Sequence, residues 1–174
     1  MFWHNEDNIS VFKGTAYSQE YKFIGETGDK YGIFQSIDDN IRESARLVNY
    51  AVYPYKSANY LENNILNVEL PSNQTFVNGS FGRGDNTMVA VTSDATDMFL
   101  PFRNVCGYLK VKLYGESVSI SRIIINGNNN EKISGRAEVA IEYGNAPEIT
   151  MNKMATNSIT LNCGDNGVQI GETD

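Results

Sequence analysis

The chain has 174 residues and a formal net charge of −7, with 14 Lys and Arg against 21 Asp and Glu, one His and two Cys. This length suits one ordinary hydrophobic core, and the acidic balance argues against nucleic acid or an anionic membrane surface as a partner. Because the sequence holds one imidazole, two thiols and no glycine-rich phosphate loop, no enzyme activity, cofactor or metal is expected.

The first part of the chain carries short strand patterns separated by glycines. Residues 9–12, 21–24 and 31–34 are each rich in residues that favour strands, and together they predict a small meander. Residues 38–45 follow with a weak helical period and predict one or two helical turns.

One longer stretch in the middle of the chain also favours a strand, and another serves to exclude a membrane span. The run 47–55 contains Pro54, which must lie at an edge, a bulge or a strand end because proline has no N–H to donate to a ladder. Residues 88–91 form one of the longest apolar runs, about four residues, whereas a membrane-spanning helix needs about 20. No transmembrane segment is therefore predicted.

The next segments alternate more regularly. Residues 109–113 place three aliphatic side chains on one parity and two lysines on the other, which predicts a half-buried strand. Residues 118–125 shift their apolar parity at Ser121, which predicts a bulge or a strand covered on both faces. The pair Asn126-Gly127 that follows is a strong hairpin signal, here with a connection longer than two residues.

Four further segments complete the pattern, at residues 137–141, 149–151, 159–161 and 168–170. The chain thus holds about eleven strand candidates, spaced as in sandwiches or barrels and unlike the strand-helix-strand rhythm of parallel sheets. No repeat or Pro-rich linker divides them. The sequence therefore predicts one all-β sandwich with little helix.

The two cysteines allow two interpretations. Cys106 and Cys163 both lie beside strand-like residues, which favours two buried small apolar side chains. A disulfide between them would close a loop of about 57 residues and stabilise the fold by about 4 kcal/mol if the protein is exported.

One tripeptide raises a binding hypothesis. Arg83-Gly84-Asp85 spells the sequence that integrins recognise, and it lies in a loop-like, glycine-rich segment. A host receptor is the partner that this motif predicts, and a chance match is the alternative.

Other residues with reactive or metal-binding groups are predicted to be structural. His4 lies near the N-terminus, where a catalytic side chain would be frayed. Asp94 and Asp97 could supply oxygen ligands to a hard cation, but they do not match the spacing of a calcium loop. These aspartates are predicted to lie in a solvated loop.

The abundance of tyrosine raises a carbohydrate hypothesis, since an exposed aromatic face can stack on a sugar ring. The candidate stacking residues are Tyr50, Tyr53, Tyr55 and Tyr60. The alternative is that some of these rings face the core and the others cover the outer surface of the sheet.

A series of segments in a fixed order resembles a known family. The series consists of Trp3, Asp7, Ile9, Val11 and Phe12, then residues 50–55, 70–75 and 102–111. It is similar to the fimbrillin-like surface proteins of Bacteroidales, which are subunits and tip components of type V pili. The similarity covers nearly the whole chain, continuing through residues 123–126 and 132–135.

The resemblance implies a transthyretin-like antiparallel β-sandwich of about seven core strands with Greek-key-type connections. It implies a non-enzymatic module of a fimbria, exported as a lipoprotein and placed on the outer membrane at the cell surface. Its partners would be other pilus subunits, joined by β-strand addition through segments outside this chain, and surface ligands of a host or another bacterium. The alternative function is a surface glycan-binding lipoprotein.

Two departures from the family pattern concern the ends of the chain. There is no lipid-acceptor Cys near the N-terminus, and the second sandwich that such proteins usually carry is missing. Residues 1–174 are therefore expected to be a single domain, the N-terminal one of a longer two-domain protein.

Overall fold

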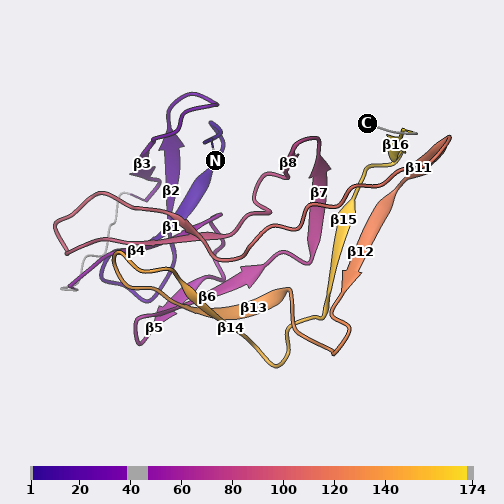
Figure 1. Ribbon diagram of the computed structural model, residues 1–174. Coiled ribbons are helices and arrows are strands. Elements are labelled where there is room, and N and C mark those ends of the chain that lie inside the picture. The colour runs from indigo at the N-terminus through magenta and orange to yellow at the C-terminus, as the bar shows by residue number, and fades with distance from the viewer. Residues whose placement is uncertain (1, 39–46, 172–174) are drawn as a thin grey trace.

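The alternating apolar residues and frequent turns of the sequence fold into β-structure. The computed structural model describes residues 2–38 and 47–171, and within these ranges it contains sixteen strands and no helix (Figure 1). The all-β prediction is therefore confirmed. None of these residues belongs to a helix that is long and apolar enough to cross a membrane. Residues 38–45, for which helical turns are predicted, lie outside the described ranges except for Asp38.

Six strands form the largest sheet, in the order β10-β9-β4-β1-β2-β3. Every neighbouring pair in this sheet is antiparallel. Strands β1 to β3 are the predicted meander, and Pro54 follows the last residue of β4, at a strand end as predicted. The strands are β1 (Asn8–Phe12), β2 (Gln19–Ile24), β3 (Ile33–Ser36), β4 (Tyr50–Tyr53), β9 (Met88–Val91) and β10 (Arg103–Asn104).

A second, four-stranded antiparallel sheet has the order β14-β13-β6-β5 and packs against one face of the first sheet, so the two make a sandwich. Asn63 and Asn64 join β5 to β6 with φ angles of 49° and 62°, which suit a tight hairpin turn. In β13, Ala137 and Val139 are buried and Glu138 is exposed, as the alternation predicts. The strands are β5 (Tyr60–Glu62), β6 (Ile65–Leu70), β13 (Gly135–Ala140) and β14 (Glu148–Met151).

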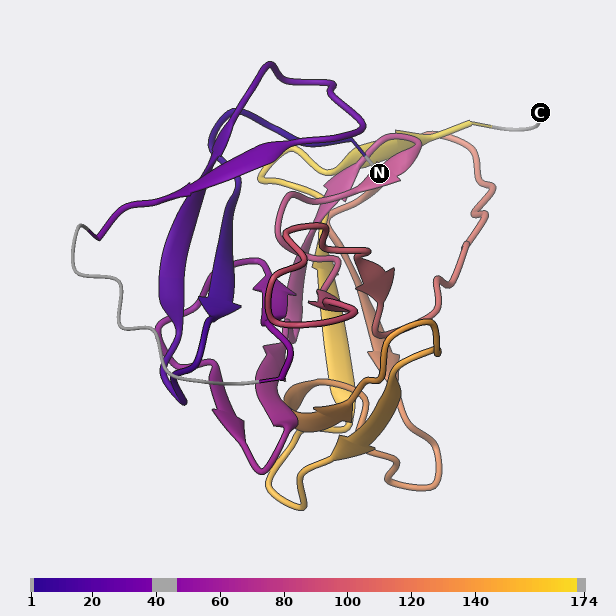
Figure 2. The same ribbon diagram turned by 90° about the vertical axis from the view of Figure 1, so that its left-hand side faces the viewer.

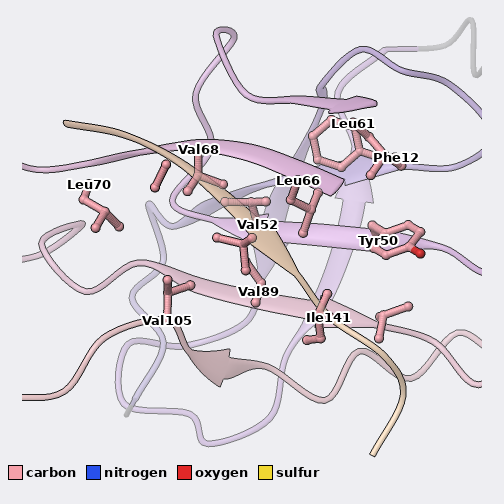
Figure 3. Close-up of a cluster of buried hydrophobic side chains, with 13 residues drawn as sticks. Phe12, Tyr50, Val52, Leu61, Leu66, Val68, Leu70, Val89, Val105 and Ile141 are labelled. Carbon is pink, nitrogen blue, oxygen red and sulfur yellow. The ribbon is translucent and has the colours of Figure 1, made fainter. Parts of the chain in front are cut away.

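Hydrophobic clusters fill both faces of the six-stranded sheet, because successive residues of β4 point to opposite sides. Tyr50 and Val52 point into the cluster between the two sheets, where apolar side chains from both sheets meet (Figure 3). Ala51 and Tyr53 point to the other face, where the Trp3 ring covers the sheet with its centroid 5.5 Å from that of Tyr53. Strand β4 is therefore buried on both sides.

The remaining strands form two smaller sheets outside this sandwich. One has the order β12-β15-β7-β8, with β15 parallel to β7 and the other pairs antiparallel, and the other consists of β11 and β16. No residue in any of these six strands is buried. The strands are β7 (Asn73–Val77), β8 (Ser80–Phe81), β11 (Val118–Ile120), β12 (Arg122–Asn126), β15 (Ser158–Asn162) and β16 (Val168–Ile170).

Two local predictions are wrong. Residues 109–113 form no strand, and Leu109 and Val111 are 71% and 46% exposed, because none of the strands within residues 2–38 and 47–171 pairs with this segment. Asn126-Gly127 does not make a hairpin either. Strand β12 pairs with β15, and β13 pairs with β6 and β14, so the connection carries the chain from one sheet to another.

The predicted shift of parity at Ser121 has a structural cause. Strand β11 ends just before Ser121 and pairs with β16, whereas β12 begins just after it and pairs with β15. The Ser121 carbonyl oxygen accepts a hydrogen bond from the Cys163 N–H at 2.9 Å. The shift therefore marks the point at which the chain changes partner strand and sheet.

Candidate functional site

The predicted receptor tripeptide lies in the loop after β8, and each of its residues is bound within the protein. The Arg83 guanidinium contacts the Glu6 carboxylate and lies 3.3 Å from the Asp7 carboxylate. The Gly84 N–H donates to the Tyr53 hydroxyl at 3.2 Å. Asp85 accepts a hydrogen bond from the N–H of Thr75 in β7 at 2.7 Å. The Arg and Asp side chains that a receptor would contact are thus both engaged by the fold.

Asp7 is the centre of this group, which we call the Asp7 cluster (Glu6, Asp7, Tyr53 and Arg83). The Asp7 side chain is 3% exposed, yet it accepts hydrogen bonds from the Tyr53 hydroxyl at 3.0 Å and from the His4 N–H at 2.8 Å. A buried carboxylate is tolerated only when such partners replace its water. The cluster therefore ties the β8 loop to the N-terminus and to β4.

Two pKa values in the cluster shift in opposite directions. Burial of the Tyr53 ring and the neighbouring Asp7 carboxylate raise the pKa of Tyr53 far above its ordinary value. The hydrogen bond and charge of Arg83 lower the pKa of the exposed Glu6 carboxyl. Both shifts follow from the Asp7 cluster holding a neutral phenol beside paired charges.

The substitution Tyr53→Phe is expected to lower the free energy of unfolding by about 1–2 kcal/mol near neutral pH, because the hydrogen bonds to Asp7 and Gly84 are lost. The raised pKa means that the folded state keeps the phenol proton that the unfolded chain releases above about pH 10. The stability difference between wild type and variant should therefore shrink as pH rises above 10. Urea unfolding at several alkaline pH values measures it.

The matched control is Tyr17→Phe, since the Tyr17 side chain is 79% exposed. This control should differ from wild type by the same small amount at every pH. A Tyr53→Phe difference that stays constant up to strongly alkaline pH would contradict the expected coupling.

The four candidate stacking tyrosines do not form one surface. Tyr50 and Tyr53 are buried on opposite faces of the six-stranded sheet, so neither offers a ring face to a sugar. Tyr55 is half-buried in a shallow hollow beside Arg83, and Tyr60 is 41% exposed at the edge of the second sheet. The prediction of a single aromatic binding face is therefore wrong for Tyr50 and Tyr53.

The cysteines also differ from the prediction. Cys106 is exposed and Cys163 is partly exposed, and both are free thiols. The interpretation as two buried apolar side chains is therefore wrong, since both thiols keep exposed surface. No disulfide joins them in the structure.

The two aspartates considered as cation ligands, Asp94 and Asp97, instead accept hydrogen bonds from backbone N–H groups of their own loop. The Asp94 carboxylate accepts hydrogen bonds from the Thr96 and Asp97 N–H groups at 2.8 and 3.0 Å, and Asp97 accepts one from the Phe99 N–H at 2.8 Å. The hydrogen bond from the Thr96 hydroxyl, together with these N–H groups, lowers the pKa of Asp94, and the bond from the Phe99 N–H lowers the pKa of Asp97. Among residues 2–38 and 47–171, no three His, Cys, Asp or Glu side chains are placed to hold a metal ion.

One feature that the sequence patterns do not predict is a partly exposed apolar surface on the β12-β15-β7-β8 sheet. Its register places apolar side chains on one face, and all of them remain partly exposed. We call this the open face, and its residues are Phe76, Phe81, Ile123, Ile125, Ile159 and Leu161. The alternation at residues 123–125 and 159–161 was a signal for it, but alternation does not say whether a second layer exists.

One stretch of chain that forms no strand, residues 107–114, crosses this sheet, and we call it the crossing segment. In Figure 1 this segment runs in front of β7 and β15. Figure 2 is turned so that the front of Figure 1 faces right, and there the segment lies to the right of the same strands. The Tyr108 ring stacks on the Phe81 ring with centroids 5.4 Å apart. The crossing segment thus begins on the open face.

Comparison with known proteins identifies no relative. No protein-family model, curated protein or solved structure matches the chain. The resemblance to fimbrillin-like proteins therefore stays a prediction, and the function is inferred from the residues and their geometry.

Proposed function

We propose that this chain is a non-enzymatic structural or adhesive module of a bacterial surface fimbria, either a pilus subunit or a tip-like cell-adhesion lipoprotein. The observation that supports this proposal most directly is the open face. A sheet whose apolar side keeps part of its surface accessible offers that surface to a neighbour, which a protein built to join others needs.

The polar clusters support the same proposal. The carboxylates of Asp7, Asp85, Asp94 and Asp97 all accept hydrogen bonds from groups of the same chain. Carboxylates with such hydrogen bonds hold loops in place. Because their oxygens already have partners, they are not well placed to transfer protons or to bind a substrate. The polar residues therefore serve the fold, and the apolar surface is left for partners.

The proposed partners and location come from the family resemblance. Neighbouring subunits of the fimbria would join the module by adding a strand to an exposed sheet edge, where main-chain hydrogen bonds give affinity and alternate side chains give specificity. The protein would be exported and anchored at the outer membrane. This assembly chemistry needs no cofactor.

The test is to delete the gene in the bacterium that encodes the chain and to count surface filaments by negative-stain electron microscopy. Loss or shortening of one filament class, restored by the intact gene, is the expected result. Gold-labelled antibodies against the chain should decorate the cell surface or the filaments. Unchanged filaments together with label confined to the cell interior would refute the proposal.

A glycan array on the purified chain distinguishes the proposed function from glycan binding. The matched variants are Tyr55→Ala and Tyr60→Ala, since these two candidate tyrosines keep exposed surface. Under the proposed function, the wild-type chain and both variants should give the same array pattern. Saturable glycan binding that disappears in both variants would replace the fimbrial proposal with the glycan-binding one.

A further inference from the structure

The chain contains three Asn-Gly pairs, which are chemically labile. They are Asn78-Gly79, Asn126-Gly127 and Asn166-Gly167. An asparagine side chain can react with the main-chain nitrogen of the next residue, and glycine hinders this reaction least because it has no Cβ. The reaction requires that the glycine nitrogen can turn toward the side chain. Because the three pairs have the same local sequence, their structural surroundings decide which of them reacts.

Hydrogen bonds hold the glycine nitrogen in two of the three pairs. The Gly127 N–H donates to the Asn157 carbonyl oxygen at 2.8 Å, and the Gly167 N–H donates to the Gly164 carbonyl oxygen at 3.0 Å. Neither nitrogen can turn toward the preceding side chain unless its hydrogen bond breaks first.

Close packing restrains the same two glycines. A Cβ placed on Gly127 would lie 2.7 Å from the Glu131 carbonyl oxygen, and one placed on Gly167 would lie 2.9 Å from the Ile120 carbonyl oxygen. Both contacts are with main chain, which gives way less easily than the end of a side chain. The peptide units of Gly127 and Gly167 therefore have little room to rotate.

Gly79 has neither restraint. In the part of the chain that the structure describes, its N–H donates no hydrogen bond, and no atom beyond its chain neighbours lies within 4 Å of the place where a Cβ would stand. Asn78 and Gly79 are both exposed and form the two-residue turn between Val77 and Ser80, with a φ of 72° at Gly79. This peptide unit can therefore rotate in solvent without a clash.

Few contacts hold the hairpin that carries Asn78. Strand β8 has two residues and pairs with β7 at two positions, Phe76 with Phe81 and Val77 with Ser80, away from the two large sheets (Figure 1). By contrast, Asn126 ends a strand that pairs with β15 at five positions. Opening so short a ladder costs less free energy than unfolding the sandwich. The Asn78 turn can therefore change conformation while the rest of the chain stays folded.

We propose that Asn78 is a site of spontaneous deamidation in the folded chain, and that the fold protects Asn126 and Asn166. The Gly79 nitrogen forms a bond to Asn78 Cγ, the bond from Cγ to Nδ2 breaks, and Nδ2 leaves as ammonia with the proton of the Gly79 amide. Water then opens the cyclic imide at either of its carbonyl groups and leaves aspartate or isoaspartate. The only co-reactant is water, and the inference does not depend on the proposed function.

The two products change the hairpin in different ways. Both add one negative charge to a chain whose net charge is −7. Isoaspartate also adds one atom to the main chain of a two-residue turn, so the pairing of Val77 with Ser80 loses its register. Phe76 and Phe81 form the next pair, so the modification alters the end of the open face that β7 and β8 supply.

The test is to incubate the purified chain at mildly alkaline pH and to follow each Asn-Gly pair by peptide mapping and mass spectrometry. Asn78 should convert at least about tenfold faster than Asn126 or Asn166, because their glycine nitrogens must first break a hydrogen bond and leave a packed position. The rate should rise with hydroxide concentration, since the Gly79 nitrogen must lose its proton to attack. Equal rates at the three pairs, or a slower rate at Asn78, would overturn the proposal.

The same incubation in urea supplies the control for local sequence. In the unfolded chain, the three pairs should convert at similar rates, so that the preference for Asn78 appears only in the folded state. If all three convert in urea and none converts in the folded chain, the fold protects Asn78 as well, and the proposal is wrong.

Single variants confirm the assignment by anion-exchange chromatography. Asn78→Gln should remove most of the acidic species that form during incubation, because the longer side chain closes its ring far more slowly. The matched control, Asn126→Gln, should form these species as wild type does, and circular dichroism checks that both variants are folded. Acidic species that still form in Asn78→Gln at the wild-type rate would place the modification elsewhere and overturn the proposal.

Discussion

Replacing Asp7 with alanine is expected to lower the free energy of unfolding by about 3 kcal/mol. The substitution leaves the buried Tyr53 hydroxyl without its acceptor, and it removes the acceptor of the His4 N–H and one of the two carboxylates beside Arg83. A hydrogen bond to a charged group contributes about 1.5–3 kcal/mol, and a buried donor left unpaired costs its full desolvation. Urea unfolding followed by circular dichroism measures the change.

The matched control is Asp165→Ala, which removes an exposed carboxylate from the connection between β15 and β16. Its unfolding midpoint should match that of wild type, because surface substitutions away from specific contacts have small effects. Equal midpoints for Asp7→Ala and Asp165→Ala would show that the Asp7 cluster does not stabilise the fold. The slope of the unfolding curve should stay constant, so that the midpoint reports stability alone.

Alternation of apolar and polar residues predicted the strands correctly where the two large sheets pack on each other. Residues 137–141 place Ala137 and Val139 in the core because β13 lies between β6 and β14 and packs on the six-stranded sheet. The meander of β1 to β3 followed from short strands separated by tight turns. In these regions, local pattern and long-range packing agree.

The same alternation misled at residues 109–113, because a strand needs a neighbour as well as a pattern. The sequence alone does not show which segments lie side by side in the folded chain. The parity shift at Ser121 had a similar limit, since a local pattern does not distinguish a bulge from a change of partner strand. Both cases lie in the part of the chain that we propose for joining neighbours.

The Asp7 cluster could not be predicted because its members are far apart in the sequence. Arg83 and Asp7 are separated by 76 residues, and Tyr53 lies between them in the chain. One signal was available: Asp7 stands at the start of the apolar run 9–12, where an aspartate beside a buried strand is expected to need partners. That signal does not identify Arg83 or Tyr53 as the partners.

The same substitution in the two parts of the fold should have different effects. Phe12→Ala removes a fully buried ring from the cluster between the two large sheets and is expected to cost about 3–5 kcal/mol of unfolding free energy (Figure 3). Phe76 is 37% exposed on the open face, so Phe76→Ala is expected to cost about 1 kcal/mol or less. Urea unfolding of both variants gives the comparison.

The comparison also tests whether the open face is available to a partner. If Phe76→Ala costs as much unfolding free energy as Phe12→Ala, the open face is part of the core, and the surface proposed for a partner does not exist.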